Sequence, residues 1–547
     1  MIRLAVIGGG PKSLFALLAL NDLLDPTVAG HITVDVYDPL PPGSGSVWRN
    51  DQPDALRLNV NAGAVDASSS INSENFAQWV NRVAPEMSRD KYPPRALVGR
   101  YLREQFQLLT RFGKLSVAHA PFVVKGVVRE GAHWCVCGPF GTRNYDEVLL
   151  ATGHGLSGAV PREPLAGAVN KQPLIGDYAS LSLAEIPPGA TVRIRGAALT
   201  AYDVALLLTE GRGGFWQHDK GRSPEQPDLH YMASGREPRR ITLTSRSGIL
   251  MDPKSEKNPA EISANLEQYR QDLRKWASQV RENPHDDGGL LGMWAILLQC
   301  AQECARLLGS TVTPLSLWRT ALTGLSVNAV SGSTNAPTQS GAAAGLRHSL
   351  AVNGRDSPIT TGWLWARVWS GLYAELVHAL DRLPRSTRAR RQFLLVARNL
   401  ERFAFGPPDL TARKLVALFD AGILQLDSSA ENRGDEILVD AVTPGPGALW
   451  AAGGNPNSDV LAGLLQAGQI SVRPGDRGLL TDPDGTCAAH DGSRNESLAA
   501  VGRPTEDPTL GHDTLNRDLH GEHRRWAHRV AGRVVNNVVE QPDLEGE

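Results

Sequence analysis

A short apolar strand that runs directly into glycines is the feature that most constrains the fold of this chain. Residues 4–10 read Leu-Ala-Val-Ile-Gly-Gly-Gly, and an apolar run of helical character follows from Leu14 to Leu24. The first glycine permits a tight turn, and the third lets the backbone approach a pyrophosphate. The helix start then offers N–H groups and a partial positive charge to phosphates. The pattern predicts a dinucleotide at this turn, with an ordinary glycine-rich turn as the alternative. We place in this first cofactor site Gly8, Gly10, Pro11, Lys12 and Ser13.

The composition of the 547 residues is typical of a soluble globular protein with several domains. Hydrophobic residues make up 41% and charged residues 21%, and the net charge is −2. This balance does not favour nucleic acid or a membrane surface as a partner, and no apolar stretch reaches the roughly 20 residues of a membrane span. The five cysteines lack metal-ligand spacing, so we expect no metal site and a reducing, cytoplasmic setting. No secretory signal is visible before the first strand.

Residues 31–38 alternate like a second strand and end in Asp38. An acid at this point of a dinucleotide fold accepts hydrogen bonds from ribose hydroxyls, although a solvated acid at a strand end is the alternative. A long loop without a regular period follows, and such loops beside cofactor sites are often functional. In it we expect Trp48 to offer a flat apolar surface to the cofactor, and Asn59 and Asn61 to offer amide groups.

Two further segments are expected to complete the first cofactor domain. A buried strand over 145–150 is followed by Ala-Thr-Gly, which places Thr152 and Gly153 beside the cofactor, as in flavoproteins that bind two dinucleotides. Near the C-terminus, residues 498–502 are predicted to form a strand and residues 511–515 to open a final helix. Its first polar residues, Asp513 and Thr514, would act on the far end of a flavin through the helix dipole; plain capping is the alternative.

A second, degenerate turn follows the strand over 191–195, where Gly196 and Thr200 stand before a helix. The next strand, 240–244, ends in Ser245 and Arg246 rather than in an acid. Arginine suits a 2′-phosphate by a charge-assisted contact, whereas an acid suits a ribose hydroxyl. The contrast with Asp38 favours FAD in the first site and NADPH in the second; a plain surface arginine is the alternative.

These pieces predict an α/β protein with two Rossmann-like dinucleotide-binding domains and a helical insertion. Helix-rich stretches with several tryptophans cover 260–310 and 361–405, and residues 327–345 have a loop composition. We therefore expect a discontinuous FAD-binding domain over 1–165 and 475–547, and an NAD(P)H-binding domain over 188–250 and 406–474. The insertion, 251–405, is expected to shape the substrate region.

With these segments placed, the chain resembles the FAD/NAD(P)-binding family related to flavin-dependent N-hydroxylating monooxygenases. It is most similar to the subgroup that contains the nitrosuccinate-forming aspartate N-monooxygenases. The chain departs from the family pattern at Ala198, where glycine is favoured, and at His512, where asparagine is favoured. The resemblance lies in Val6-Ile-Gly-Gly-Gly-Pro11, Val36-Tyr-Asp-Pro39, Gly43-Ser-Gly-Ser-Val-Trp48, Leu149-Leu-Ala-Thr-Gly-His154, Leu199-Thr-Ala-Tyr-Asp203, Ser245-Arg-Ser-Gly248, Phe405-Gly-Pro-Pro408, Gly502-Arg-Pro-Thr-Glu-Asp507 and Asp513-Thr-Leu-Asn-Arg517.

The resemblance implies an FAD- and NADPH-dependent monooxygenase that uses O₂. Through a C4a-hydroperoxide of the flavin, such an enzyme N-hydroxylates the amine of a small amino acid or related metabolite. The alternative is an FAD/NAD(P)H oxidoreductase that passes electrons to another acceptor without oxygen insertion. An acidic substrate needs cations for its carboxylates, and Arg57, Lys254 and Arg413 are the candidates, although a surface or NADPH contact is the favoured explanation of each. The sequence names no catalytic residue, and it leaves a homo-oligomer open.

Overall fold

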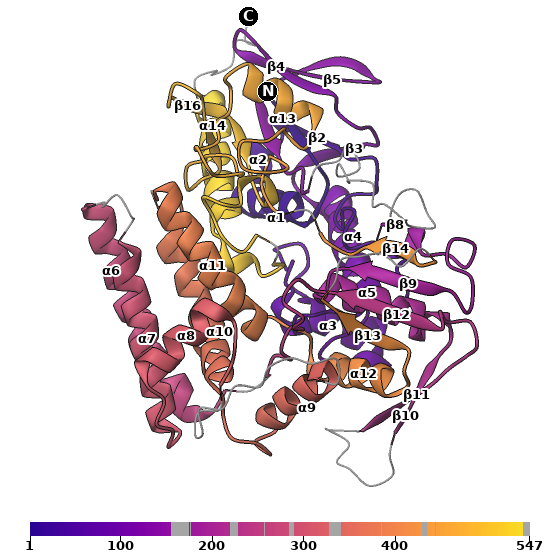
Figure 1. Ribbon diagram of the computed structural model, residues 1–547. Coiled ribbons are helices and arrows are strands. Elements are labelled where there is room, and N and C mark those ends of the chain that lie inside the picture. The colour runs from indigo at the N-terminus through magenta and orange to yellow at the C-terminus, as the bar shows by residue number, and fades with distance from the viewer. Residues whose placement is uncertain are drawn as a thin grey trace, which may run out of the picture.

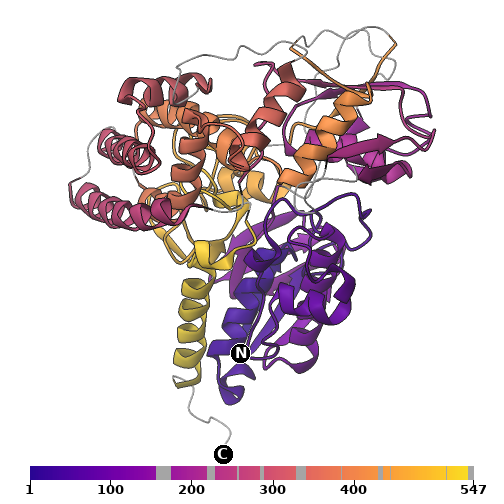
Figure 2. The same cartoon turned by 90° about the horizontal axis from the view of Figure 1, so that it is seen from below.

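Two separate parallel sheets and a helical region make up the computed structural model, which confirms the expected α/β class (Figure 1). The structure describes residues 1–547 except 155–173, 176, 219–227, 256–257, 284–288, 328–340, 384, 429–434, 444, 513 and 540–547. Seen from below, the N-terminal sheet and its helices, the second sheet and the helical region form three neighbouring masses (Figure 2). Within the described part, no helix is both long and apolar enough to cross a membrane.

The first sheet joins the two ends of the chain. The strand β7 pairs in parallel with β1 on one side and with β16, from the C-terminal part, on the other. All neighbours are parallel except β15, which runs antiparallel to β16. In spatial order the strands are β15 (Thr486–Ala488), β16 (Arg494–Ala500), β7 (Glu147–Leu150), β1 (Ile2–Ile7), β2 (Ile32–Tyr37) and β3 (Ser116–Ala120).

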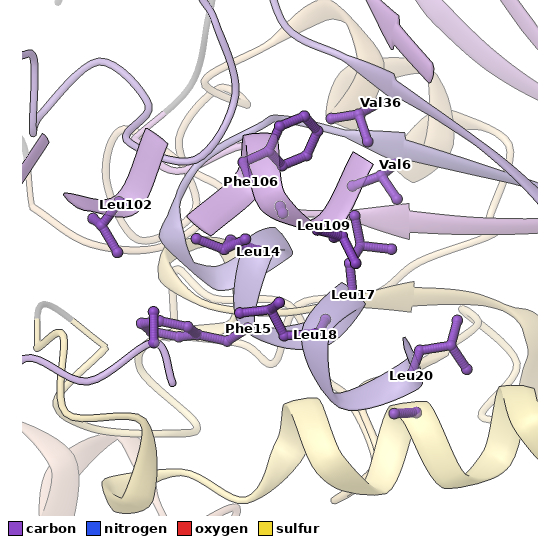
Figure 3. Close-up of a cluster of buried hydrophobic side chains, with 14 of the residues drawn as sticks. Val6, Leu14, Phe15, Leu17, Leu18, Leu20, Val36, Leu102, Phe106 and Leu109 are labelled. Carbon is purple, nitrogen blue, oxygen red and sulfur yellow. The ribbon is translucent and has the colours of Figure 1, made fainter. Parts of the chain in front are cut away.

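Alternation along β1 divides the core of this sheet between its two faces. Leu4 and Val6 point to the face covered by α1 (Pro11–Leu23), α4 (Arg95–Phe112) and α14 (Glu522–Val539). Figure 3 shows Val6 and Val36 facing Leu14, Leu17 and Phe106 from two of these helices. The other face carries Ala5 and Ile7 and packs against the three-stranded sheet β4 (Gly126–Glu130), β5 (His133–Gly138) and β6 (Gly141–Tyr145). Each fully buried valine, leucine, isoleucine or phenylalanine side chain contributes about 1.5–3 kcal/mol to the stability of the fold.

The second sheet is also parallel and is built around β9 (Thr191–Arg195). Its order is β13 (Leu424–Asp427), β12 (Arg240–Thr244), β9, β14 (Ile437–Asp440) and β8 (Leu174–Ile175). The helices α5 (Leu199–Leu208) and α12 (Asp409–Asp420) contribute to its core, as do residues of the hairpin strand β11 (Leu229–Met232). The partner strand of that hairpin is β10 (Phe215–His218). Because the chain leaves β9 for β12 on one side and β14 lies on the other, the carboxyl end of β9 is a switch point of the kind that binds ligands.

The helical region has its own core, which includes the buried side chains of Trp276, Trp294, Trp363, Trp365 and Trp369. It consists of α6 (Ala260–Glu282), α7 (Leu290–Leu307), α8 (Pro314–Thr323), α10 (Thr361–Leu380) and α11 (Thr387–Ala404). One further helix, α9 (Gly341–Asn353), instead sends Ala342 and Leu346 into the core of the second sheet. The expectation of a loop over 327–345 is therefore wrong for residues 341–345, and 328–340 lie outside the described residues.

Two more segments differ from the sequence expectation. The final helix begins at Glu522 and not at Gly511; residues 511–512 and 514–516 are not helical, and a short 3-10 turn over Arg517–Leu519 follows them. The helix α13 (Asp459–Gln466) packs on β4, with Val460 and Leu461 in the core of the first sheet. We therefore propose that the chain returns to the first unit before residue 448 rather than at 475.

Candidate dinucleotide-binding sites

The turn between β1 and α1 is shaped by glycines with different surroundings. Gly8 has φ +105°, and a Cβ on it would lie 2.3 Å from the carbonyl oxygen of Ala151. Its N–H donates to the Tyr37 carbonyl at 2.9 Å, which ties the turn to β2. A Cβ on Gly10 would meet nothing within 4 Å. No side chain caps the start of α1, so the space at Gly10 opens onto a helix N-terminus, which attracts phosphate.

Asp38 closes this turn from the end of β2. Its carboxylate accepts the backbone N–H groups of Gly9, at 2.7 Å, and Leu40, at 2.8 Å. The side chain is buried, and burial raises its pKa while these two hydrogen bonds oppose the shift. Asp38 therefore holds the phosphate turn against β2 even without a ligand. Each carboxylate oxygen keeps further acceptor capacity, so the ribose contact stays a prediction.

The fit of a dinucleotide is supported by groups that the protein itself leaves unused here. Thr152, at the end of β7, has a buried hydroxyl with no hydrogen-bond partner, and its backbone N would lie 3.3 Å from a Cβ on Gly8. A Cβ on Gly153 would also meet open space. Ser13 uses its hydroxyl internally, donating to the Gly10 carbonyl at 2.7 Å. The free space at Gly10 and Gly153, the uncapped start of α1 and the unpartnered hydroxyl of Thr152 fit a pyrophosphate and its sugar.

The loop residues expected at the flavin ring differ in how available they are. Trp48 is half-buried and packs against the core of the first sheet. Asn59 is half-buried, and no hydrogen bond of its side chain is found in the described part of the chain. Asn61 is exposed, and its side-chain oxygen accepts the N–H of Gly63 at 2.9 Å, which caps a short 3-10 helix. Of the three, Asn61 is the one with a local structural role.

The C-terminal loop lies over the start of α1. Gly502 approaches Lys12 so closely that a Cβ on it would lie 2.9 Å from that side chain. Asp513 lies outside the described residues, and the hydroxyl of Thr514 accepts the N–H of Asn516 at 3.0 Å. Because the last helix begins at Glu522, its dipole acts from that residue and not from 513–514.

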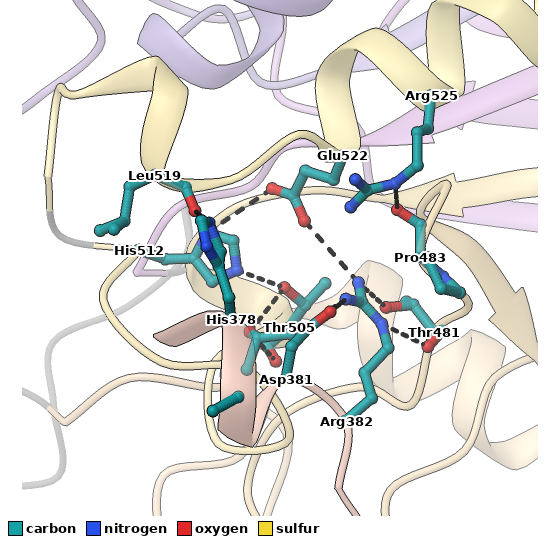
Figure 4. Close-up of polar contacts among 12 residues, drawn as sticks. His378, Asp381, Arg382, Thr481, Pro483, Thr505, His512, Leu519, Glu522 and Arg525 are labelled. Carbon is teal, nitrogen blue, oxygen red and sulfur yellow. Dashed lines mark hydrogen bonds and ion pairs between the residues drawn. The ribbon is translucent and has the colours of Figure 1, made fainter. Parts of the chain in front are cut away.

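Sequence reasoning missed a buried group that we call the C-terminal polar cluster: Arg382, Thr505, His512 and Glu522 (Figure 4). Glu522 accepts the Gly502 N–H at 3.1 Å and lies 3.5 Å from His512 Nδ1 and 3.8 Å from Arg382. His512 Nε2 is 3.3 Å from the Thr505 hydroxyl. The cluster thus connects the helical region, the C-terminal loop and the start of α14. No local pattern links these residues, because Arg382 is far along the chain from Thr505, His512 and Glu522, and these three do not follow a regular spacing.

Burial sets the protonation of this cluster. It lowers the pKa of His512 well below its ordinary value and raises the pKa of Glu522, with the charge of Lys12 acting on both groups. The ring of His520 stacks on His512 with centroids 3.9 Å apart, and burial lowers its pKa to about 3. The histidines beside the first cofactor turn are therefore neutral at physiological pH.

The second turn has the form of a nucleotide site at the switch point of the second sheet. Gly196 has φ +120°, and its N–H donates to the Thr244 carbonyl at 3.2 Å. No side chain caps the start of α5, where the Thr200 hydroxyl lies 3.0 Å from that of Thr443 on the loop after β14. Ser245 directs its hydroxyl to the Ile249 carbonyl at 3.2 Å. Arg246 is exposed just beyond β12, and no ion pair of its guanidinium is found within the described ranges.

The three cations suggested for a substrate carboxylate are not equally free. Arg57 forms an ion pair with Asp90, and Lys254 lies over the ring of Tyr92, 5.1 Å from its centroid. Since the Tyr92 N–H donates to Asp90, these two cations lie along one seam between the first sheet's loop and the second unit. Arg413 is half-buried on α12 and has no ion pair in the part of the chain that the structure describes.

Comparison with known proteins defines the class of the N-terminal part. Residues 5–155 match the model of a family described as FAD-NAD(P)-binding, and that range contains the first turn, Asp38 and Thr152. The N-terminal part of this chain is therefore similar to FAD-NAD(P)-binding domains, as expected from the sequence. Among the described residues, no group of three or more His, Cys, Asp or Glu side chains could hold a metal ion.

Two relatives confirm the expected similarity to N-monooxygenases. The chain is 30% identical over 279 residues to nitrosuccinic acid synthase npaA of Aspergillus oryzae (strain ATCC 42149 / RIB 40), covering 45% of this chain and 40% of that protein. It is 28% identical over 289 residues to an L-aspartate N-monooxygenase (nitrosuccinate-forming) of Streptomyces cremeus, covering 45% and 42%. The chain thus spans about two-fifths of the length of these relatives. A crystal structure of Lactococcus lactis thioredoxin reductase aligns with 98% of this chain and 100% of its own, at 9% identity and a TM-score of 0.39.

Proposed function

We propose that this chain is an FAD-dependent, NADPH-using monooxygenase that N-hydroxylates the amine of a small amino acid or related metabolite. The observation that carries the proposal is the pair of glycine turns with opposite chemistry beside them. A buried carboxylate, Asp38, follows the first, and an exposed guanidinium, Arg246, follows the second. The similarity to N-monooxygenases over 45% of the chain supports the reaction class.

In this proposal the protein binds and orients the two nucleotides and excludes water from them. The turn at Gly8–Ser13 and the start of α1 hold the FAD pyrophosphate, while Asp38 and Thr152 take its sugar. Gly196, Thr200, Ser245 and Arg246 hold NADPH at the switch point of the second sheet. Bound flavin supplies the hydride and oxygen chemistry. Because Arg57 and Lys254 already have protein partners, Arg413 is the first of the three cations to test against a substrate carboxylate.

Oxygen insertion is tested by incubating the full chain with FAD, NADPH, ¹⁸O₂ and a panel of small amino acids that includes L-aspartate. The proposal predicts that one amine stimulates NADPH oxidation and yields an N-oxygenated product that carries ¹⁸O in mass spectrometry. NADPH oxidation that no amine changes, together with rapid electron transfer to an added acceptor dye, would instead establish an oxidoreductase without oxygen insertion.

A further inference from the structure

A large cavity lies apart from both glycine turns. Its volume is ≈ 700 Å³, and its walls come from the loop after β12 and from α9, α10 and α11. Neither the Gly8–Ser13 turn nor the Gly196–Thr200 turn contributes to the lining. The volume lies within the roughly 300–1,000 Å³ of pockets that bury drug-sized ligands. The cavity is therefore large enough for a complete organic ligand.

One wall carries a buried cation whose hydrogen-bonding capacity is only partly used. Arg367 on α10 is 3% exposed, and its Nη1 donates to the Ser255 carbonyl at 3.0 Å and to Asn258 Oδ1 at 3.1 Å. Its Nε is buried and has no hydrogen-bond partner. Burial lowers its pKa to about 10, so the guanidinium is still charged at neutral pH. A buried charged donor without a full set of partners is costly, and a bound anion removes that cost.

A second unpartnered donor lies beside the first. Trp363, one helical turn before Arg367, is 7% exposed, and its indole N–H has no partner. The Arg367 guanidinium lies 5.3 Å from the centroid of this ring. The geometry joins an indole donor and a guanidinium donor on one face of α10, at the cavity wall.

The other charged groups of the wall pair with one another. Arg402 lies 3.5 Å from Asp252 and donates to the Leu250 carbonyl at 3.1 Å, and Asp252 also accepts the Ser349 hydroxyl at 2.8 Å. Arg367 is the remaining cation of the lining, and the charge of Asp409, which is not itself among the lining residues, acts on it. The remaining wall combines polar side chains, such as His348 and Asn353, with the apolar side chains of Leu250, Leu346, Val352 and Phe403.

From these observations we propose that the cavity binds an amphipathic organic anion: a carboxylate, sulfonate or phosphate group at Arg367 and Trp363, and an apolar body along α9 and α11. This site is separate from the two nucleotide turns. The proposal does not rest on the proposed oxygenase activity, because it follows from volume, burial and unpartnered donors alone. The anionic group meets the two unpartnered donors, and the apolar side chains of the lining take a body larger than that of a small amino acid.

The test uses the full-length protein and 8-anilinonaphthalene-1-sulfonate as the probe. N-phenyl-1-naphthylamine, which has the same rings without the sulfonate, is its neutral counterpart. We expect one site per chain for the sulfonate, detected by fluorescence titration, and binding of the neutral probe at least about tenfold weaker, as one charge-assisted contact implies. Arg367→Met should weaken sulfonate binding about tenfold, while Arg398→Met, an exposed arginine on α11, should leave it unchanged.

A cavity-filling variant keeps the test decisive if Arg367→Met does not fold. A Cβ on Gly345, which lines the cavity, meets nothing within 4 Å, so Gly345→Phe places a ring there without a clash and should abolish sulfonate binding. Equal affinity for the two probes, or unchanged binding in Gly345→Phe, would overturn the proposal. Displacement of the probe by NADP⁺ in the wild type but not in Arg246→Ala would also overturn it, because the cavity would then belong to the coenzyme site.

Discussion

Gly8 and Gly10 lie two residues apart, yet the structure requires glycine at these positions for different reasons. An alanine at position 8 meets a backbone carbonyl at 2.3 Å and a strained φ, whereas an alanine at position 10 meets only open space. We expect Gly8→Ala to lower the free energy of unfolding by roughly 1–3 kcal/mol or more. Gly10→Ala should change it by less than about 0.5 kcal/mol but weaken FAD binding, because its methyl group occupies the approach of the pyrophosphate.

Urea unfolding of the FAD-free protein and flavin titration of each variant check this pair. Loss of FAD affinity without loss of stability in Gly10→Ala is the informative result. If Gly10→Ala binds FAD as tightly as the wild type, the first turn is not the pyrophosphate site.

Arg246 tests the assignment of the second site. Arg246→Ala should raise the KM for NADPH about tenfold or more and leave the KM for NADH unchanged, because only NADPH has the 2′-phosphate. Arg236→Ala is the matched control, since Arg236 is also exposed but precedes β12 instead of following it. An unchanged NADPH/NADH preference in Arg246→Ala would show that the 2′-phosphate contact is wrong.

At the scale of single residues, the sequence predicted the position of groups that lie directly at the end of a strand, while their roles stay predictions. The glycines of both turns, Thr152 and Arg246 lie at the strand ends where the motif placed them. The sequence could not predict that Asp38 would accept the N–H of Gly9 or that Asn61 would cap a 3-10 helix, because both hydrogen bonds depend on the conformation of loops. It also missed Arg382, His512 and Glu522, whose proximity is created by tertiary packing alone.

Among the elements, α14 packs the C-terminal part of the chain against the first sheet, to which β16 also belongs. Trp526 and Val530 enter the core beside α1, and Arg529 and Arg533 pair with Glu147 of β7, which is 1% exposed. Arg529→Met leaves the buried Glu147 with Arg533 as its remaining partner, so the loss of this charged hydrogen bond should cost about 1.5–3 kcal/mol of unfolding free energy.

Chemical denaturation measures this cost, and the double variant Glu147→Gln with Arg529→Met is its control. The double variant should be more stable than Arg529→Met alone, since the buried carboxylate that lost one of its two partners is then absent. A single variant as stable as the wild type would mean that α14 is not held by this contact.

The buried histidines next to the start of α14 are expected to make the free energy of unfolding depend on pH. Burial lowers the pKa of His520 to about 3 and of His523 to about 4, whereas both titrate near 6.5 when unfolded. Below pH 6.5 the unfolded chain therefore binds more protons, and each histidine removes up to about 1.4 kcal/mol per pH unit as the pH falls toward its folded value. The raised pKa of Glu522 acts with the opposite sign, because the folded state then holds the extra proton above the unfolded pKa of the carboxyl.

Urea unfolding between pH 6.5 and 5 measures this slope. His520→Gln should reduce it by about one proton, and His528→Gln, at an exposed position on α14, should leave it unchanged. Equal slopes in the wild type and His520→Gln would contradict the burial of a neutral His520.

At the scale of elements, strands and helices with clear apolar patterns were predicted well, and polar segments were not. Residues 511–515 have the composition of a helix start, but the helix begins only at Glu522, where Trp526 and Val530 can pack. Residues 341–345 are small and were expected in a loop, but they form the start of α9, and Ala342 is buried in the core of the second sheet. In both segments tertiary packing decided between conformations that local propensity left nearly equal.

In the whole molecule, the units built on the two sheets meet along a seam that contains an ion pair and a cation–π contact. Arg95 on α4 lies 2.7 Å from Asp203 on α5, and Arg57 and Lys254 lie along the same boundary. The two glycine turns belong to different sheets, so hydride transfer between their ligands requires this seam to hold both nucleotides in one arrangement. Sequence motifs identified the two turns, but only packing shows which loops join them.

The most direct test of the two-nucleotide account is anaerobic reduction of the bound flavin, followed by absorbance after rapid mixing. The account predicts one FAD per chain, reduction by NADPH faster than by NADH, and loss of that preference in Arg246→Ala. A protein that binds FAD through the first turn but whose flavin NADPH fails to reduce would contradict it.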